Sequence, residues 1–226
     1  DEGTQSNDYK DTYNDYIQYK EQNSAMRKAK KIIKDFNGDT HKTVLFLSYK
    51  AENWNTMDNI YKKYCQEKDI KVIVQCVPYY YKNIDGTFEK YIDGGMYPEY
   101  VTITPIEDYN YVNENPDVIV FQYPYDNYNS AGTTDPVFYS YNLASHTQKL
   151  IYIPYFRTDE IEENDMRAYT NMDAYVTMPG VVYADKVIVQ SEEIRKLYIK
   201  KLTDFFGEES EDEWEDKIEA EDIGGI

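Results

Sequence analysis

Short apolar runs alternate with helix-patterned segments between residues 41 and 206, and this alternation limits the possible fold more than any other feature of the chain. Near-continuous apolar runs are typical of strands that are covered on both faces, and apolar residues at every third or fourth position are typical of helices. This rhythm predicts an α/β fold over residues 41–206: a Rossmann-like domain with a doubly wound, mostly parallel sheet. The expected strands are Thr43–Tyr49, Lys71–Val77, a weaker Val101–Thr104, Asp117–Phe121, Leu150–Ile153 and Lys186–Val189, and the expected helices are Asn55–Lys68 and Glu192–Phe206.

Residues 1–40 predict a helical lead-in to this domain, made of one helix or two. It closes at Asn37-Gly38-Asp39, a sequence typical of a helix end followed by a turn. The lead-in could pack on the domain or connect it to a preceding segment. Its apolar residues at helical spacing are Tyr9, Tyr13, Tyr16 and Ile17, followed by a second stripe of Met26, Ala29, Ile32, Ile33 and Phe36.

Residues 207–226 predict an acidic terminal helix or tail that leads to a second domain absent from this chain. Between Glu208 and Asp222 there are ten acids and a single base, Lys217. Trp214 and Ile218 are four residues apart and could attach a short helix to the domain. A solvated terminal helix is the alternative.

The charge of the chain excludes several classes of partner. With 24 Lys and Arg against 42 Asp and Glu the net charge is −18, which repels nucleic-acid backbones and anionic lipid surfaces. No run approaches the roughly 20 apolar residues of a membrane span, and the N-terminus lacks the pattern of a secretion signal. Cys65 and Cys76 do not make a disulfide framework. We therefore expect a cytoplasmic, reducing compartment and no nucleic-acid partner.

Ligands of open α/β sheets bind beyond the carboxyl ends of the strands. Three of these ends place proline next to tyrosine, at Pro78-Tyr79, Pro124-Tyr125 and Pro154-Tyr155. Proline ends a strand and stiffens the loop, so each tyrosine can be directed into the crevice; the alternative is that these tyrosines fill space. Codon bias in an AT-rich genome is another explanation for the 26 tyrosines as a whole. The candidate ligand-binding residues are Lys50, Trp54, Tyr79, Gln122, Tyr125, Asp126, Tyr128, Tyr155, Gln190 and Ser191, with Ser191 also expected to be the N-cap of the last long helix.

The usual signatures of cofactor and metal sites are absent from the sequence. The turn at 48–54 contains no glycine, so it can form neither a dinucleotide-binding loop nor a phosphate loop. Cys65, Cys76, His41 and His146 lack the spacing of metal ligands. We expect no metal and no cofactor, and the sequence assigns no catalytic residue.

A few polar residues near the strand ends have two interpretations each. Lys50, Lys82 and Arg157 could neutralise a phosphate or form surface ion pairs. Asp126 could be a general base or an Asx-turn cap for residues 127–129.

The chain resembles the front half of bacterial CDP-glycerol glycerophosphotransferase-like proteins, which are related to teichoic-acid polymerases. The similarity covers about residues 42–219 and consists of ordered sequence words. These are TVLFLSYKAENWNTMDNIYKK, VPYYYKNIDGTFEK, YPEYVTIT, NPDVIVFQYPYDNYN, DPVFYSYNL, KLIYIPYF, MPGVVYADKVIVQSEEIRKLYI and DEWEDKI.

The resemblance implies the first, acceptor-side domain of a two-domain architecture of the glycosyltransferase-B type. The family reaction moves glycerol phosphate from CDP-glycerol to a hydroxyl of a cell-envelope polymer and releases CMP. The donor-binding half is expected after residue 226, so this chain alone should not catalyse the reaction. Family members often have His-Asn where this chain has Gln122-Tyr123, and a glutamine cannot accept the proton that a histidine could. Lys50, Trp54, Pro124, Tyr125, Asp126, Tyr128 and Gln190-Ser191-Glu192 match the family pattern.

Two functions therefore stay open at this point. The first is the acceptor-side domain of a glycerophosphotransferase-like enzyme, with a polyol-phosphate ligand and a second α/β domain as its partners. In that case contact with the inner face of the cell membrane would come through the full-length protein. The second is a non-catalytic α/β module that binds a ligand or a protein.

Overall fold

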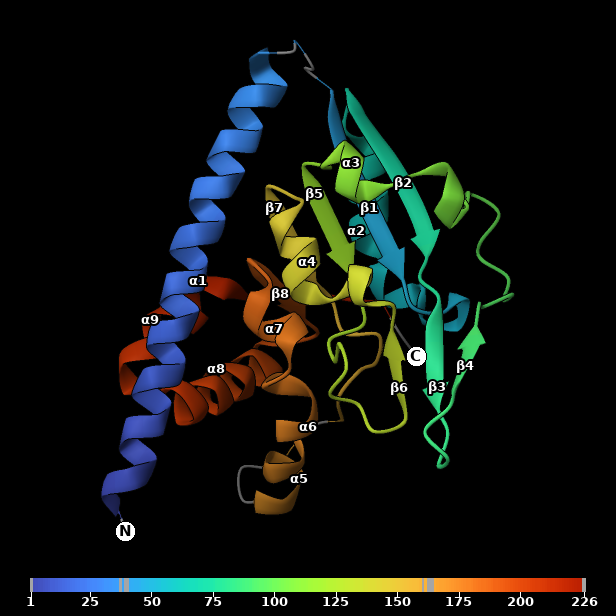
Figure 1. Cartoon of the computed structure of the whole chain (residues 1–226). Coiled ribbons are helices and arrows are strands. Elements are labelled where there is room, and N and C mark those ends of the chain that lie inside the picture. The colour runs from blue at the N-terminus through green and yellow to red at the C-terminus, as the bar shows by residue number, and fades with distance from the viewer. Residues whose placement is uncertain (1, 37, 39–40, 160, 162–164, 225–226) are drawn as a thin grey trace.

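The computed structural model describes residues 2–36, 38, 41–159, 161 and 165–224, with side chains from residue 13 onward. Its centre is a six-stranded sheet in the order β2-β1-β5-β7-β8-β9, in which every pair of neighbours is parallel (Figure 1). This confirms the predicted α/β, doubly wound fold. The strands are β1 Lys42–Ser48, β2 Ile70–Cys76, β5 Val118–Phe121, β7 Lys149–Tyr152, β8 Lys186–Val189 and β9 Ile218–Ala220.

The direction of winding reverses at β1, which pairs with β2 on one side and with β5 on the other. Such a reversal leaves a crevice at the carboxyl ends of the two central strands, where the neighbouring connections diverge. The expected strand Val101–Thr104 is wrong, since only an isolated parallel bridge joins Ile103 to Val74 of β2. Pro98 and Pro105 flank this segment and lack the N–H group that a longer ladder needs.

Helices cover the two faces of the sheet unequally. One face packs mainly on α2, with Phe46, Trp54 and Ile60 in its core. The other face carries a larger core that includes Tyr16 of α1, Leu143 of α4 and several residues of α8. The helices are α1 Glu2–Phe36, α2 Asn55–Gln66, α3 Tyr111–Glu114, α4 Ser140–Ser145, α5 Met166–Asn171, α6 Asp173–Val176, α7 Pro179–Tyr183, α8 Glu192–Phe206 and α9 Glu211–Lys217, with single 3-10 turns at Ala51–Asn53, Ile106–Asp108, Pro136–Phe138 and Glu208–Ser210.

A second, three-stranded antiparallel sheet was not predicted. It has the order β4-β3-β6 and is formed by β3 Tyr79–Lys82, β4 Phe88–Tyr91 and β6 Gly132–Thr134. Figure 1 shows it beyond the carboxyl ends of β2 and β1. Gly86 has a φ of +83°, which suits the tight turn between β3 and β4. The tyrosines that follow β2 therefore belong to a strand and are held in place by its ladder.

Both ends of the described chain pack on the domain. α1 is one continuous helix that crosses the larger core face, and its Tyr16 ring lies 5.4 Å from that of Trp214. Trp214 is fully buried and β9 pairs with β8, so the sheet continues past Phe206, where we expected the domain to end. Trp214 and Ile218 thus attach the acidic segment to the core. Within the part of the chain that the structure describes, no helix combines the length and apolarity that a membrane crossing requires.

Candidate functional site

Tyrosines converge at the carboxyl edge of the sheet, over the crevice between β1 and β5. Tyr49 follows β1, and its ring centroid lies 4.9 Å from that of Tyr79, 5.1 Å from that of Tyr123 and 5.0 Å from that of Tyr155. These rings come from four different segments, so the fold assembles them. We define the tyrosine cluster as Tyr49, Tyr79, Tyr81, Tyr91, Tyr123, Tyr125 and Tyr155.

The local backbone explains how these rings are directed to one place. Pro124 follows β5 closely, and its carbonyl accepts a hydrogen bond of 2.8 Å from the N–H of Gly180 in α7. A Cβ at Gly180 would lie 2.4 Å from the Pro124 Cα, so only glycine permits this approach. The loop that carries Tyr123 and Tyr125 is therefore fixed against the body of the domain.

The hydroxyl groups of Tyr49, Tyr79 and Tyr125 remain protonated near neutral pH. Burial raises the pKa of Tyr49, Tyr79 and Tyr125 above the ordinary value of 10, and neighbouring tyrosines raise it further. The Tyr125 and Tyr155 hydroxyl oxygens lie 3.4 Å apart, and those of Tyr79 and Tyr81 lie 3.3 Å apart. These phenols can donate and accept hydrogen bonds.

Lys50 is the cation that contacts rings of the tyrosine cluster in the part of the chain that the structure describes. Its Nζ lies 5.4 Å from the centroid of the Tyr49 ring and 5.5 Å from that of Tyr79, within the range of cation–π contacts. Its carboxylate neighbour, Glu52, is 3.5 Å away and largely exposed. An ion pair of this kind is weak, so the ammonium can change partner when an anion arrives.

Gln122 holds the loop after β1 instead of facing the crevice. Its Oε1 accepts a hydrogen bond of 3.0 Å from the N–H of Tyr49. Its Nε2 donates to the Asn53 carbonyl and to the Thr56 hydroxyl, both at 2.9 Å. The side chain is fully buried. Gln122 is therefore a positioning residue for the loop that carries Tyr49 and Lys50.

Asp126 is also directed into the body of the domain. Its Oδ1 accepts hydrogen bonds from the Ser140 N–H and hydroxyl, at 2.9 and 2.8 Å, at the start of α4. Burial raises its pKa to about 6, while the two bonds from Ser140 act in the opposite direction. The carboxylate thus caps α4, and neither role expected of it, a base in the cleft or a cap for residues 127–129, describes this geometry.

Four other predicted residues lie outside the cluster. Trp54 is 2% exposed and belongs to the core beneath α2, and Tyr128 is 72% exposed in a turn. Gln190 uses both ends of its amide on the backbone of Thr158. Ser191 caps α8 through the Ile194 N–H, as predicted. The structure therefore brings together Lys50, Tyr79, Tyr125 and Tyr155 from the predicted set.

The two other basic residues near the strand ends have structural contacts. Lys82 donates to the carbonyls of Asn127 and Asn129, both at 2.7 Å. Arg157 donates to the carbonyl of Ile223 at 2.9 Å. Each of them holds a neighbouring segment at this edge.

Aromatic rings fill the crevice itself. The internal space beneath the cluster is a cavity of about 10 Å³, lined by Tyr49, Tyr123 and the buried Thr134 among others. A ligand of this edge would accordingly lie on the rim of the cluster, against Lys50 and the partly exposed tyrosines.

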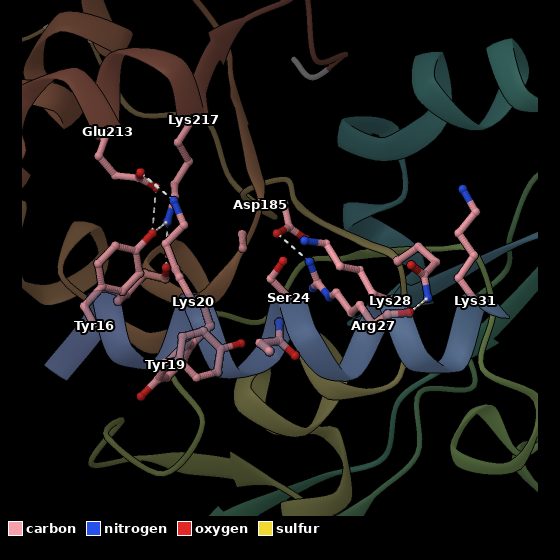
Figure 2. A pocket seen from close by; sticks show the side chains of 15 residues that line it. Tyr16, Tyr19, Lys20, Ser24, Arg27, Lys28, Lys31, Asp185, Glu213 and Lys217 are labelled. Atoms are coloured by element: carbon pink, nitrogen blue, oxygen red, sulfur yellow. Dashed lines mark hydrogen bonds and ion pairs between the residues drawn. The ribbon is translucent and has the colours of Figure 1, made fainter. Parts of the chain in front are cut away.

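A larger hollow lies elsewhere, along α1, and the sequence interpretation missed it. This α1 groove has a volume of about 370 Å³ and runs between α1 and the region of α7 and α9 (Figure 2). Residues 182–185 and Gln148 precede strands of the sheet, so the groove lies toward the amino ends of β7 and β8. A sequence signal existed in the polar residues of α1 at spacings of three and four: Tyr16, Lys20, Asn23 and Arg27.

Ion pairs and a buried lysine form one end of the α1 groove. Glu213 accepts hydrogen bonds from the Tyr16 hydroxyl at 2.8 Å and from Lys20 Nζ at 2.5 Å. Lys217 is 4% exposed and donates to the Tyr16 hydroxyl and the Val182 carbonyl, both at 2.7 Å. Burial lowers the pKa of Lys217 to about 7.

Comparisons with known proteins give this geometry no relative: no family model, curated protein or solved structure matches the chain.

Proposed function

We propose that this chain is the acceptor-side domain of a glycerophosphotransferase-like enzyme, and that its tyrosine cluster binds the polyol-phosphate acceptor. The observation that carries the proposal is the meeting of Lys50 with the rings of Tyr49 and Tyr79, in a cluster of tyrosines from several strand ends, where the sheet reverses its winding. Ligands of such sheets bind at that edge. The ordered sequence words quoted above supply the choice of ligand class.

The chemistry of the edge suits a phosphate-linked polyol. Phenol groups match the donor and acceptor pattern of polyol hydroxyls, and their ring faces accept the C–H groups between them. The Lys50 ammonium would neutralise one phosphate. Seven tyrosines with a single central lysine favour a ligand that is rich in hydroxyls and modest in charge.

In this proposal the domain binds the acceptor and a second α/β domain supplies the rest of the chemistry. During transfer the acceptor oxygen forms a bond to the phosphorus of the glycerol phosphate group, the bond from that phosphorus to CMP breaks, and a base takes the acceptor proton. The Gln122 amide is bonded to the loop after β1 and the Asp126 carboxylate to Ser140, which favours a base from outside the cluster. The full-length enzyme would work in the cytoplasm at the inner face of the membrane, with no nucleic-acid partner.

The first test is binding by the chain as it stands. Lys50→Met keeps the aliphatic contact with the rings and removes the charge. We expect it to raise the Kd for sn-glycerol 3-phosphate oligomers about tenfold in calorimetry. Lys90→Met is a matched control on the exposed strand β4 and should change nothing. Unchanged affinity in both Lys50→Met and Tyr125→Ala would overturn the site.

The transfer reaction needs a separate test on a chain that includes a second domain. Release of CMP from CDP-glycerol in the presence of a polyol acceptor is the expected result. If no polyol acceptor supports release while the chain still binds glycerol phosphate oligomers, the domain is a non-catalytic binding module.

A further inference from the structure

The α1 groove concentrates positive charge on a chain whose net charge is −18. Five of its lining residues are basic, namely Lys20, Arg27, Lys28, Lys31 and Lys217, and two are acidic, Asp185 and Glu213. A hollow with this excess raises the local concentration of anions, even where the rest of the surface repels them.

Both acids of the groove are already paired. Asp185 Oδ1 forms an ion pair with Arg27 Nη1 at 2.7 Å, and Glu213 Oε2 forms one with Lys20 Nζ at 2.5 Å. Arg27 is held further by the Ala144 carbonyl, which accepts from its Nε at 3.1 Å. These pairs build the walls of the groove and leave little negative charge to attract the remaining cations.

Lys28 and Lys31 are those remaining cations. Neither has a described acid within ion-pair distance, although both line the groove. Ser24 lies one turn before Lys28, and the spacings of four and three residues put all three side chains along one side of α1. Figure 2 shows Ser24 and Lys28 toward Asp185 and Arg27, with Lys31 one turn farther along the helix and its side chain extending away from them. Together they place two ammonium groups and a hydroxyl along the wall of the groove.

Phosphate oxygens fit this arrangement better than other common anions do. A phosphate group accepts several hydrogen bonds at once and carries enough charge to engage two ammonium groups. The size of the groove, about 370 Å³, accommodates a phosphate group together with the part of the molecule that carries it.

We propose that the α1 groove is a binding site for a phosphate-bearing anion, held by Ser24, Lys28 and Lys31 and distinct from the tyrosine cluster. It lies toward the amino ends of β7 and β8, whereas the cluster lies at the carboxyl edge of the sheet. The site therefore does not depend on the function proposed for that edge.

The same phosphate chemistry has two sources, a soluble phosphoester and the headgroup of an anionic lipid. An exposed apolar stripe continues along the second half of α1, with Ile32 68%, Ile33 61% and Phe36 90% exposed. A helix that carries lysines beside such a stripe resembles interfacial helices, so the experiment includes a lipid arm.

The experiment uses pyrophosphate in calorimetry, and flotation with vesicles of phosphatidylglycerol in phosphatidylcholine. The variant Lys28→Glu with Lys31→Glu should weaken binding about tenfold or more in whichever arm the parent chain binds. A charge-matched control is Lys71→Glu with Lys196→Glu, at two exposed lysines outside the groove. Lys50→Met should leave groove binding unchanged, which separates the two sites.

The arms identify the source and can also overturn the proposal. Binding of pyrophosphate alone assigns a soluble phosphoester. Vesicle binding that is also lost in Ile33→Ser with Phe36→Ser assigns a lipid headgroup. No binding in either arm, or equal losses in the groove variant and its charge-matched control, would show that the groove is not a phosphate site.

Discussion

The tyrosine cluster and the α1 groove lie toward opposite ends of the strands of one sheet and are built in opposite ways. The cluster is a filled aromatic surface in which hydroxyls pair with one another and Lys50 lies over two of the rings. The groove is an open hollow in which charged side chains pair with one another and leave two lysines over. The parallel sheet creates the first site by its winding, and a long helix laid across the sheet creates the second.

This difference shows that the location of a site and the empty space available to a ligand there are separate properties. The reversal of strand order specifies where a ligand should bind in an open α/β sheet. It does not guarantee an empty space there, because rings fill the crevice down to about 10 Å³. The substitutions below test whether the two regions are as independent as their construction suggests.

The largest effect is expected for Trp214, which supports the groove from within the core. It is fully buried, packs against Tyr16 at 5.4 Å and Phe206 at 5.0 Å, and donates from Nε1 to the Ser210 hydroxyl. Trp214→Ala should lower the free energy of unfolding by about 3–5 kcal/mol in urea titrations. Phe36→Ala, on the exposed stripe of α1, should stay within about 0.5 kcal/mol. If Trp214→Ala and Phe36→Ala lowered the free energy of unfolding equally, α1 would have to bury Phe36 against the domain, unlike in the structure described above.

A smaller effect is expected for Gln122, which serves the tyrosine edge. Gln122→Ala removes the hydrogen bonds to the Tyr49 N–H, the Asn53 carbonyl and the Thr56 hydroxyl, of which the last two still bond each other at 3.2 Å. The cost should be about 2 kcal/mol in the same titration, with weaker binding at the cluster and unchanged binding in the groove. Gln148→Ala is the matched control in the groove, where a single bond to the Arg27 carbonyl is lost, for about 0.5 kcal/mol. Loss of groove binding in Gln122→Ala would show that the tyrosine cluster and the α1 groove are energetically coupled.

The smallest effect is a pH dependence that belongs to the groove alone. The folded-state pKa of Lys217 is about 7, below the ordinary 10.5, so between these values the unfolded chain binds more protons than the folded chain. Stability from this group therefore rises with pH across that window, and the penalty for burying the charge is fully present below about pH 7. From about pH 6 to about pH 8 the parent chain should gain on the order of 1 kcal/mol over Lys217→Met.

The comparison with Lys217→Met isolates this titration, because Glu213, Tyr16, Lys20 and Asp185, which face the lysine, are present in both chains. Unfolding curves that remain parallel over the whole pH range would mean that Lys217 keeps its proton in the folded state.

Periodicity alone predicted most of the sheet. The runs at 43–49 and 117–121 form β1 and β5, with boundaries shifted by one residue. A continuous apolar run is stable mainly in a sheet that is covered on both faces, and this made the two strands predictable. The prediction that failed, Val101–Thr104, was a short run between two prolines. The sheet of β3, β4 and β6 was missed because its ladder joins Tyr80 to Thr133, and such distant pairing leaves no local signal.

The site was predictable in part for similar reasons. The Pro-Tyr pairs indicated the tyrosines because strand ends share an edge of the sheet. Gln122 and Asp126 look like site residues in sequence, and only the coordinates show their amide and carboxylate bonded inward. The apolar stripe of Met26 to Phe36 left open whether the lead-in packs on the domain, and in the structure Arg27, Lys30 and Lys34 bond to the domain.

The contact between Tyr16 and the last helix has a consequence for how the protein is made. Tyr16 donates to Glu213 and accepts from Lys217, across separations of 197 and 201 residues. During synthesis α1 leaves the ribosome before α9, and the contact cannot form until the positions that separate Tyr16 from Glu213 and Lys217 have been made. The Tyr16 side chain lacks these two partners for that interval, so we expect docking of α1 onto α9 to come late in the folding of this domain.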